Sequence, residues 1–302
     1  MSFKKPLFYF FGLVLPFALS ALLFATGHAA EELNLEATRA DAGHGNAMAQ
    51  FKMGEAYARG RGVKQDPAMA AEFYRKAAEQ GNPMAENNLA ALYAQGTGVK
   101  RDDGEAAKWF RKAAEQGLAQ SQNSLGWMLA HGYGVAKDIK EALIWYQKAA
   151  GQGLLPAQLN LAQIYYFGGY GVEKNYSEAA QWVTKAAAQG SPWAQNTLGV
   201  MLENGLGMPA DAKEAASWFA KAAEQDDAKA QSNLGRLYAT GSGVERDPVK
   251  ACQWLSLSAD NGEVTAQKLL TGFQPGMTPD QIAEGKRLAE EFKKGKESAT
   301  QP

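Results

Sequence analysis

Apolar residues recur at helical spacing along most of this chain. In the block from residue 81 to residue 116, Ala85, Leu89, Ala90 and Tyr93 occupy positions i, i+4, i+5 and i+8. This spacing places the four side chains on one face of a helix. A second amphipathic stretch follows in the same block, with a large aromatic residue and then a pair of alanines. The pattern therefore predicts two short helices that pack against each other.

The block recurs six times, with a period of 36 residues that lengthens to 37 in the fourth copy. The copies span residues 45–80, 81–116, 117–152, 153–189, 190–225 and 226–261. The large aromatic of the second stretch recurs as Phe73, Trp109, Trp145, Trp182, Trp218 and Trp254. Ordering one block costs about 50 kcal/mol of conformational entropy, more than two short helices recover by burial. Stacking turns these aromatics into a continuous core, so the sequence predicts an all-α solenoid of helix–turn–helix repeats.

The boundary between the two predicted helices has its own signature in every copy. A G-x-G-V turn, such as Gly96-Thr97-Gly98-Val99, ends the first helix, because glycine adopts the left-handed conformation without a Cβ penalty. The predicted N-caps of the second helices are Asp66, Asp102, Asp138, Asn175, Asp211 and Asp247. Four copies add a glutamate three residues later, predicted to complete a capping box: Glu105, Glu141, Glu178 and Glu214. Since these carboxylates keep one register, we interpret them as helix caps and not as catalytic pairs.

The first helix also carries a column of small residues. Glycine occupies the Ala90 column at Gly54 and Gly199, although glycine lowers helix propensity. We interpret this column as the place where neighbouring helix backbones approach each other closely.

Residues 1–29 have the layout of a secretory signal peptide. Lys4 and Lys5 precede an apolar run over residues 7–24, and small residues lead to a cut after Ala29. The predicted location is therefore periplasmic or secreted, with no membrane span after cleavage. The run is 18 residues long, so an uncleaved anchor stays open as the alternative.

Both ends of a solenoid need caps with a polar outer face. Residues 30–44 are predicted to form an N-terminal capping helix, residues 262–294 a partial repeat with a closing helix, and residues 295–302 a polar tail.

The pattern A-x-x-x-L-G-x-x-Y-x-x-G-x-G-V-x-x-D-x-x-x-A-x-x-W-[FY]-x-K-A-A closely resembles the Sel-like repeat family, a short-period relative of the tetratricopeptide repeats. The resemblance covers residues 45–261 and also extends to the C-terminal MTPDQIAEGKRLAEEF segment. It implies a right-handed superhelix whose first helices line a concave face. It further implies an adaptor in a protein complex, in bacterial envelope signalling or in host interaction. A cysteine-rich branch of the family is credited with β-lactam chemistry, but this chain lacks the paired cysteines of that branch.

Composition excludes several kinds of chemistry. With 31 basic and 32 acidic residues the net charge is −1, and no basic domain indicates a nucleic-acid partner. Cys252 is the single cysteine, in a column otherwise filled by small residues, and we interpret it as a buried core residue. Only His44 and His131 follow the signal, so we expect no metal site and no cofactor.

The candidate site follows from the resemblance, which places one face of the first helices on the concave surface. That face carries aromatic and amide side chains outside the predicted core columns: Asn87, Asn123, Trp127, His131, Tyr166, Phe167, Trp193, Asn196 and Arg236. Aromatic rings supply contact area and amides bind a peptide backbone, which is the combination that anchors a peptide. We therefore predict a protein or peptide partner in this groove and no enzymatic activity. A cell-wall or β-lactam-processing enzyme is the alternative, and a secreted host-interaction factor would use the same binding surface.

Overall fold

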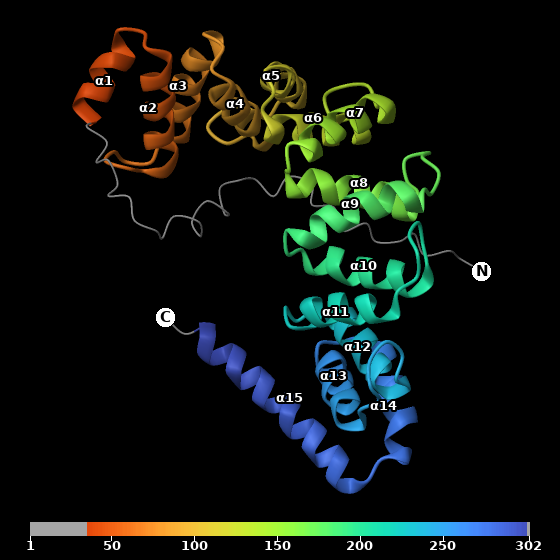
Figure 1. Ribbon diagram of the computed structural model, residues 1–302. Helices are drawn as coiled ribbons and strands as arrows, with labels where there is room; N and C mark the ends of the chain where they lie inside the picture. Colours follow the sequence, from red (N-terminus) through yellow and green to blue (C-terminus); the bar gives the residue numbers. More distant parts are fainter. Residues whose placement is uncertain (1–34, 301–302) are drawn as a thin grey trace. The chain divides into compact units, whose positions relative to one another are not determined.

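The computed structural model describes residues 35–300 (Figure 1). The predicted signal peptide, residues 1–29, and the first residues of the predicted N-terminal cap lie outside this part. The described residues form helices, apart from one isolated bridge between Gly169 and Val172. None of these helices combines the length and the apolar character that a membrane crossing needs. The all-α architecture that the periodicity predicts is confirmed.

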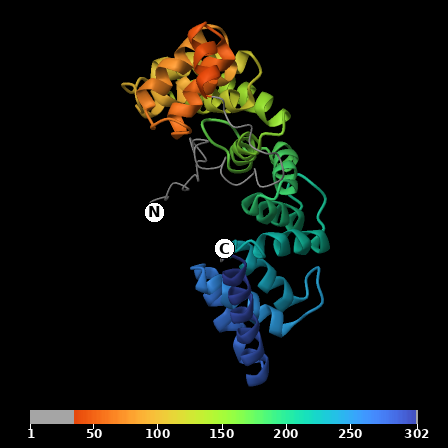
Figure 2. The same ribbon diagram turned by 90° about the vertical axis from the view of Figure 1, so that its left-hand side faces the viewer.

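The chain divides into two compact units, with the boundary after Leu161 inside one helix. Unit 1 contains α1 (Leu35–Gly43), α2 (Ala47–Arg59), α3 (Pro67–Glu79), α4 (Pro83–Gln95), α5 (Asp103–Glu115), α6 (Ala119–His131) and α7 (Ile139–Gly151). Each helix of this unit packs against the next along the chain from α1 to α6, and α6 packs against α7 (Figure 1, Figure 2). Stacked helix pairs of the predicted kind therefore build the unit.

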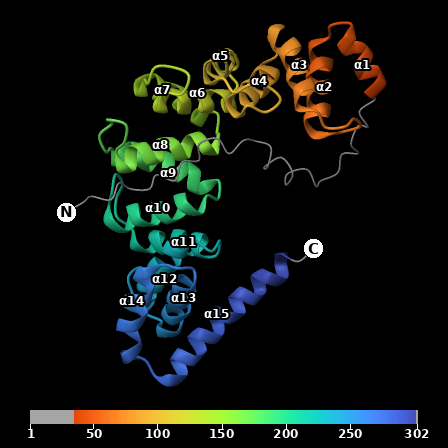
Figure 3. The ribbon, with the colours of Figure 1, turned by 180° about the vertical axis from the view of Figure 1, so that it is seen from behind.

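Helix α8 (Leu155–Phe167) contains the boundary, and the rest of the chain forms unit 2. This unit continues with α9 (Tyr176–Ala188), α10 (Pro192–Asn204), α11 (Ala212–Ala223), α12 (Ala228–Thr240), α13 (Pro248–Asp260), α14 (Val264–Phe273), the short 3₁₀ helix η1 (Gln274–Gly276) and α15 (Pro279–Thr300). Helix α15 packs along α13 and closes the stack at the C-terminal end (Figure 3). There Phe292 meets Trp254 edge to face at 5.4 Å between ring centroids, and Lys293 binds Asp260 at 2.6 Å.

The predicted caps of the second helices are confirmed in all six repeats. Each Asp or Asn accepts a backbone N–H from the first turn of its helix, as Asp102 does from Glu105 at 3.0 Å. The capping-box prediction is wrong, because the glutamates bind elsewhere. The carboxylate of Glu105 accepts the indole N–H of Trp109, and Glu141 and Glu214 make the same bond to the tryptophan four residues on. The N–H of Asp102 donates instead to the carbonyl of Tyr93, which leaves the glutamate free for the ring.

The most completely buried column of the second helices lies one residue after the predicted aromatic column. Tyr74, Phe110, Tyr146 and Phe219 are almost wholly buried. The tryptophans lie nearer the surface, where lysines four or three residues away cover their rings, as Lys112 covers Trp109 at 4.1 Å. The amphipathic lysine stems thus complete the cover of the core.

The small-residue column of the first helices receives these buried side chains. A Cβ added to Gly199 would lie 2.6 Å from the ring of Phe219, and one added to Gly54 would lie 2.5 Å from the ring of Tyr74. The close approach that the sequence predicts is therefore real, but at these two positions it joins a helix backbone to an aromatic ring. The second glycine of the turn makes a backbone approach, since a Cβ on Gly98 would lie 2.2 Å from the carbonyl oxygen of Pro67.

Candidate interaction surface

The candidate residues fall into one set in each unit. Unit 1 contains Asn87 on α4 and Asn123, Trp127 and His131 on α6. Unit 2 contains Tyr166 and Phe167 at the end of α8, Trp193 and Asn196 on α10, and Arg236 on α12. All nine residues lie on first helices of repeats, as their column requires.

The three asparagines join neighbouring repeats. Asn87 accepts a hydrogen bond from Ser121 at 2.8 Å, and Asn123 accepts one from Asn160 at 3.0 Å. In unit 2 Asn196 accepts one from Asn233, also at 3.0 Å. The amide oxygens of these candidates are therefore engaged within the stack. A partner would have to use their remaining polar atoms.

An aromatic cluster occupies the end of α6. Trp127 and Tyr133 stack with 5.0 Å between ring centroids and 10° between planes, and the His131 ring lies 4.4 Å from that of Trp127. Tyr133 is 42% exposed, so one face of the stack is open to solvent. We name Trp127, His131 and Tyr133 the aromatic cluster. Sequence analysis missed Tyr133, which occupies the variable position of its G-x-G-V turn.

The histidine of the aromatic cluster is held in one orientation. Its Nδ1 lies 2.8 Å from the carbonyl oxygen of Trp127, which makes Nδ1 the protonated nitrogen. Burial lowers the pKa of His131, and nearby Lys137 acts in the same direction, against the raising effect of the hydrogen bond. The imidazole is therefore neutral at pH 7.

Aromatic residues also gather where α8 ends in unit 2. Tyr166 meets Phe167 edge to face at 4.9 Å and Tyr176 at 5.6 Å. Phe167 is 40% exposed, whereas burial raises the pKa of Tyr166. The extra residue of the fourth repeat reshapes the turn that follows, where Tyr170 adopts a φ of 54° and burial raises its pKa to about 12. The inserted residue thus changes the surface beside Phe167.

The remaining candidates of unit 2 are half-buried. Arg236 forms an ion pair with Glu203, with 2.7 Å between nitrogen and oxygen. Trp193 packs on its own helix, and its carbonyl accepts the hydroxyl of Thr197. A bound partner would meet a neutralised guanidinium here and not an isolated positive charge.

Within residues 35–300 no group of three or more His, Cys, Asp or Glu side chains could hold a metal ion. Cys252 is completely buried, in agreement with its predicted core role. The surface offers aromatic faces and paired polar groups, an arrangement suited to binding.

Comparison with known proteins identifies the repeat. The family model described as Sel1 repeat matches residues 47–82, 83–118, 119–154, 155–191, 194–227 and 228–263. A Sel1 repeat protein from Oxalobacter formigenes is 33% identical and has a TM-score of 0.61, over 81% of this chain and 96% of that one. A protective antigen of uropathogenic Escherichia coli, c5321, displays an SLR fold and is 31% identical over 85% of this chain and 71% of its own, with a TM-score of 0.39. No curated protein matches the chain.

Proposed function

We propose, because the chain belongs to the Sel1 repeat family, that it is a binding scaffold which holds a protein or peptide partner on the first-helix surface of its repeats. Sel1 repeat proteins are generally protein-interaction scaffolds. The observation that carries the proposal is the aromatic cluster, whose stacked rings present an open face at Tyr133. Exposed aromatic residues rarely serve a monomer and often anchor a partner.

The surroundings of the aromatic cluster support binding by area and hydrogen bonds. His131 is neutral at pH 7, and the nearby Arg101 is bound to Asp103 through two contacts of 3.0 Å. Neither contributes an unbalanced charge, so recognition here rests on ring contacts and neutral polar groups.

The experiment compares capture of partners from a native envelope extract by the wild-type chain and by the double variant Trp127→Ala, Trp193→Ala. We expect the double variant to lose the captured protein while keeping its circular dichroism spectrum. Trp218→Ala is the matched control, because Trp218 is half-buried on a second helix of unit 2 and lies outside the candidate surface. Equal capture by the wild type and the double variant would refute the assignment.

The proposed location is the bacterial periplasm or the exterior, and it rests on the signal layout of residues 1–29. Expression with a C-terminal tag, followed by fractionation and mass spectrometry of the mature N-terminus, tests it. We expect a chain that starts at Ala30 and is released with the periplasmic fraction. A full-length chain in the membrane fraction would favour the uncleaved anchor.

A further inference from the structure

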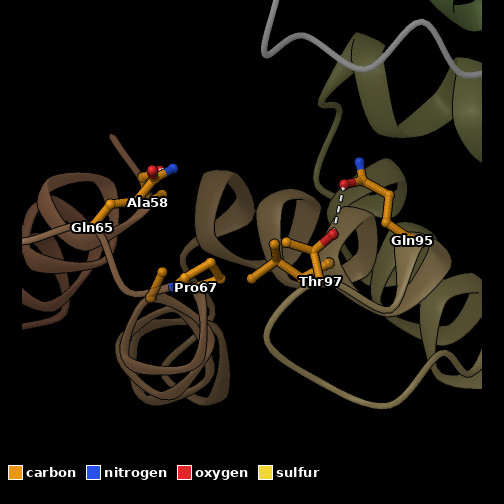
Figure 4. A pocket seen from close by; sticks show the side chains of 7 residues that line it. Ala58, Gln65, Pro67, Gln95 and Thr97 are labelled. Carbon is orange, nitrogen blue, oxygen red and sulfur yellow. Dashed lines mark hydrogen bonds between the residues drawn. The ribbon is translucent and has the colours of Figure 1, made fainter. Parts of the chain in front are cut away.

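Two small pockets lie at equivalent places in successive repeats of unit 1. The first has a volume of about 190 Å³, and its lining includes Ala58, Gln65, Pro67, Leu92, Gln95 and Thr97 (Figure 4). The second has a volume of about 150 Å³ and is lined by Ala94, Arg101, Asp103, Trp127, Met128 and Tyr133. Adding 36 to five of the residue numbers of the first pocket gives five of those in the second. We call them the first and second inter-repeat pockets, each the size of one side chain.

Each inter-repeat pocket contains a buried N–H group that has no hydrogen-bond partner. In the first this group is Nε2 of Gln95, and in the second it is Nε1 of Trp127. The other end of the Gln95 amide is occupied, since Oε1 accepts the hydroxyl of Thr97 at 3.2 Å (Figure 4). Buried donors without acceptors are rare in proteins and destabilise the fold that holds them. An incoming acceptor would relieve both.

The charged and polar groups at the pockets are already matched. Arg101 is bound to Asp103, and Nε2 of Gln65 donates to the carbonyl of Ala58 at 2.9 Å. The unmet need is therefore for neutral acceptors, which carbonyl oxygens supply, and the rest of the walls are largely apolar. A carboxylate would find no free cation among these lining residues.

Unit 2 does not repeat this arrangement. The residue equivalent to Gln95 in the fifth repeat is Asn204, whose Nδ2 donates to the carbonyl of Val200 at 2.8 Å. The residue equivalent to Trp127 in the sixth repeat is Arg236, which is bound to Glu203. The donors at these positions are satisfied, so the feature belongs to the first unit.

We infer that the two inter-repeat pockets hold one extended, uncharged peptide segment, with an apolar side chain in each pocket and main-chain carbonyls accepting from Gln95 and Trp127. Neighbouring helices pack roughly 10 Å apart, and an extended chain advances about 3.3 Å per residue. The two apolar side chains therefore stand three residues apart. This inference rests on the proposed scaffold function and specifies the partner that unit 1 recognises.

The test uses the full chain and a synthetic library of acetylated, amidated dodecapeptides. We expect the bound peptides to share two apolar residues at positions i and i+3 with no charged residue between them. Two variants remove the donors while keeping most of the side-chain volume, Gln95→Met and Trp127→Phe. Each should weaken binding of a selected peptide by about three- to tenfold, the value of one hydrogen bond. Asn204→Met is the matched control in unit 2 and should leave binding unchanged.

The melting temperature of the free variants separates a binding role from a structural one. Removing an unsatisfied buried donor should leave the free protein as stable as before or more so, although peptide binding weakens. Peptides that bind both variants as well as the wild type would overturn the inference and leave the scaffold function standing. No binding by any library member would also overturn it, while the capture experiment with Trp127→Ala, Trp193→Ala tests the scaffold function separately. Ordered waters on both N–H groups that a bound peptide does not displace would count against it as well.

Discussion

The side-chain amide of Gln116 donates a hydrogen bond to the carboxylate of Glu86, with 2.8 Å between Nε2 and Oε2. Other repeats place glutamine at the position of Glu86, and each of these glutamines accepts the same bond and donates to a carbonyl of the preceding second helix: Gln50, Gln122, Gln195 and Gln231. Glu86 is only 2% exposed, and burial raises its pKa. An ionised carboxylate has no proton to donate, so the second repeat lacks the second bond.

Glu86→Gln is therefore expected to stabilise the protein at neutral pH. The variant gains a hydrogen-bond donor and loses a buried charge, which we expect to be worth about 1 kcal/mol or more. Because the folded-state pKa of Glu86 lies above its unfolded value, its protonation favours the fold at low pH, and this contribution is lost as pH rises through the folded pKa. Thermal unfolding followed by circular dichroism at pH 5 and pH 8 should show a larger gain at pH 8.

The reciprocal variant Gln122→Glu is the control for Glu86→Gln. It places a carboxylate where Gln122 now donates to the carbonyl of Ala114 at 3.1 Å. We expect it to lower the melting temperature at pH 8 and to lower it less at pH 5. A Glu86→Gln variant whose stability equals that of the wild type at both pH values would contradict this reading of the column.

Asp226 adopts a φ of 65° at a turn where other repeats have glycine. The left-handed conformation costs a residue with a Cβ about 1 kcal/mol. Asp226→Gly is expected to stabilise the protein by about 0.5–1 kcal/mol, measured by urea unfolding. The control Asp226→Ala removes the 3.8 Å contact with Lys296 and keeps the strain, so it should bring no gain. A larger gain from alanine than from glycine would show that the carboxylate, and not the backbone, is the source of the instability.

Gly199→Ala is expected to destabilise the protein although alanine is the better helix former. The added methyl group would meet the ring of Phe219, and overpacking of this kind costs about 1–3 kcal/mol against a propensity gain of about 1 kcal/mol. Gly151→Ala is the matched control on α7, where an added Cβ meets no atom within 4 Å. It should raise stability by about 0.5 kcal/mol. Opposite signs in the two melting temperatures would support the packing argument, and equal gains would contradict it.

Cys252 should resist thiol reagents in the native protein. Its side chain is completely buried, and Gly285 of α15 packs directly on it, since a Cβ added there would lie 2.6 Å from the Cβ of Cys252. Labelling with a maleimide, followed by mass spectrometry, should give no adduct in buffer and one adduct in denaturant. Rapid labelling in buffer would mean that α15 detaches from α13 in solution.

The repeat, its two helices and the caps between them were predictable because each depends on residues close together in the sequence. A cap such as Asp102 binds a backbone N–H three residues away, and a turn glycine satisfies a local backbone angle. The glutamates were misinterpreted for the same reason, since the cap position and the tryptophan four residues on are both within reach of Glu105. Local spacing could not decide between them.

The candidate surface was only partly accessible to sequence reasoning. Column spacing selected Trp127 and His131, but Tyr133 joins them through the turn and belongs to no helical column. The asparagines appeared as partner-facing amides, whereas bonds such as Asn123 to Asn160 join residues 37 positions apart in sequence.

The sequence by itself determined a stack of helix pairs, because a periodic apolar pattern can be buried only by neighbouring copies. Tertiary structure decided which polar atoms of that stack are satisfied and which are left over. A hydrogen bond requires two groups to meet at a defined distance and angle, and for Gln95 and Trp127 the packing of successive repeats brings no acceptor to the N–H.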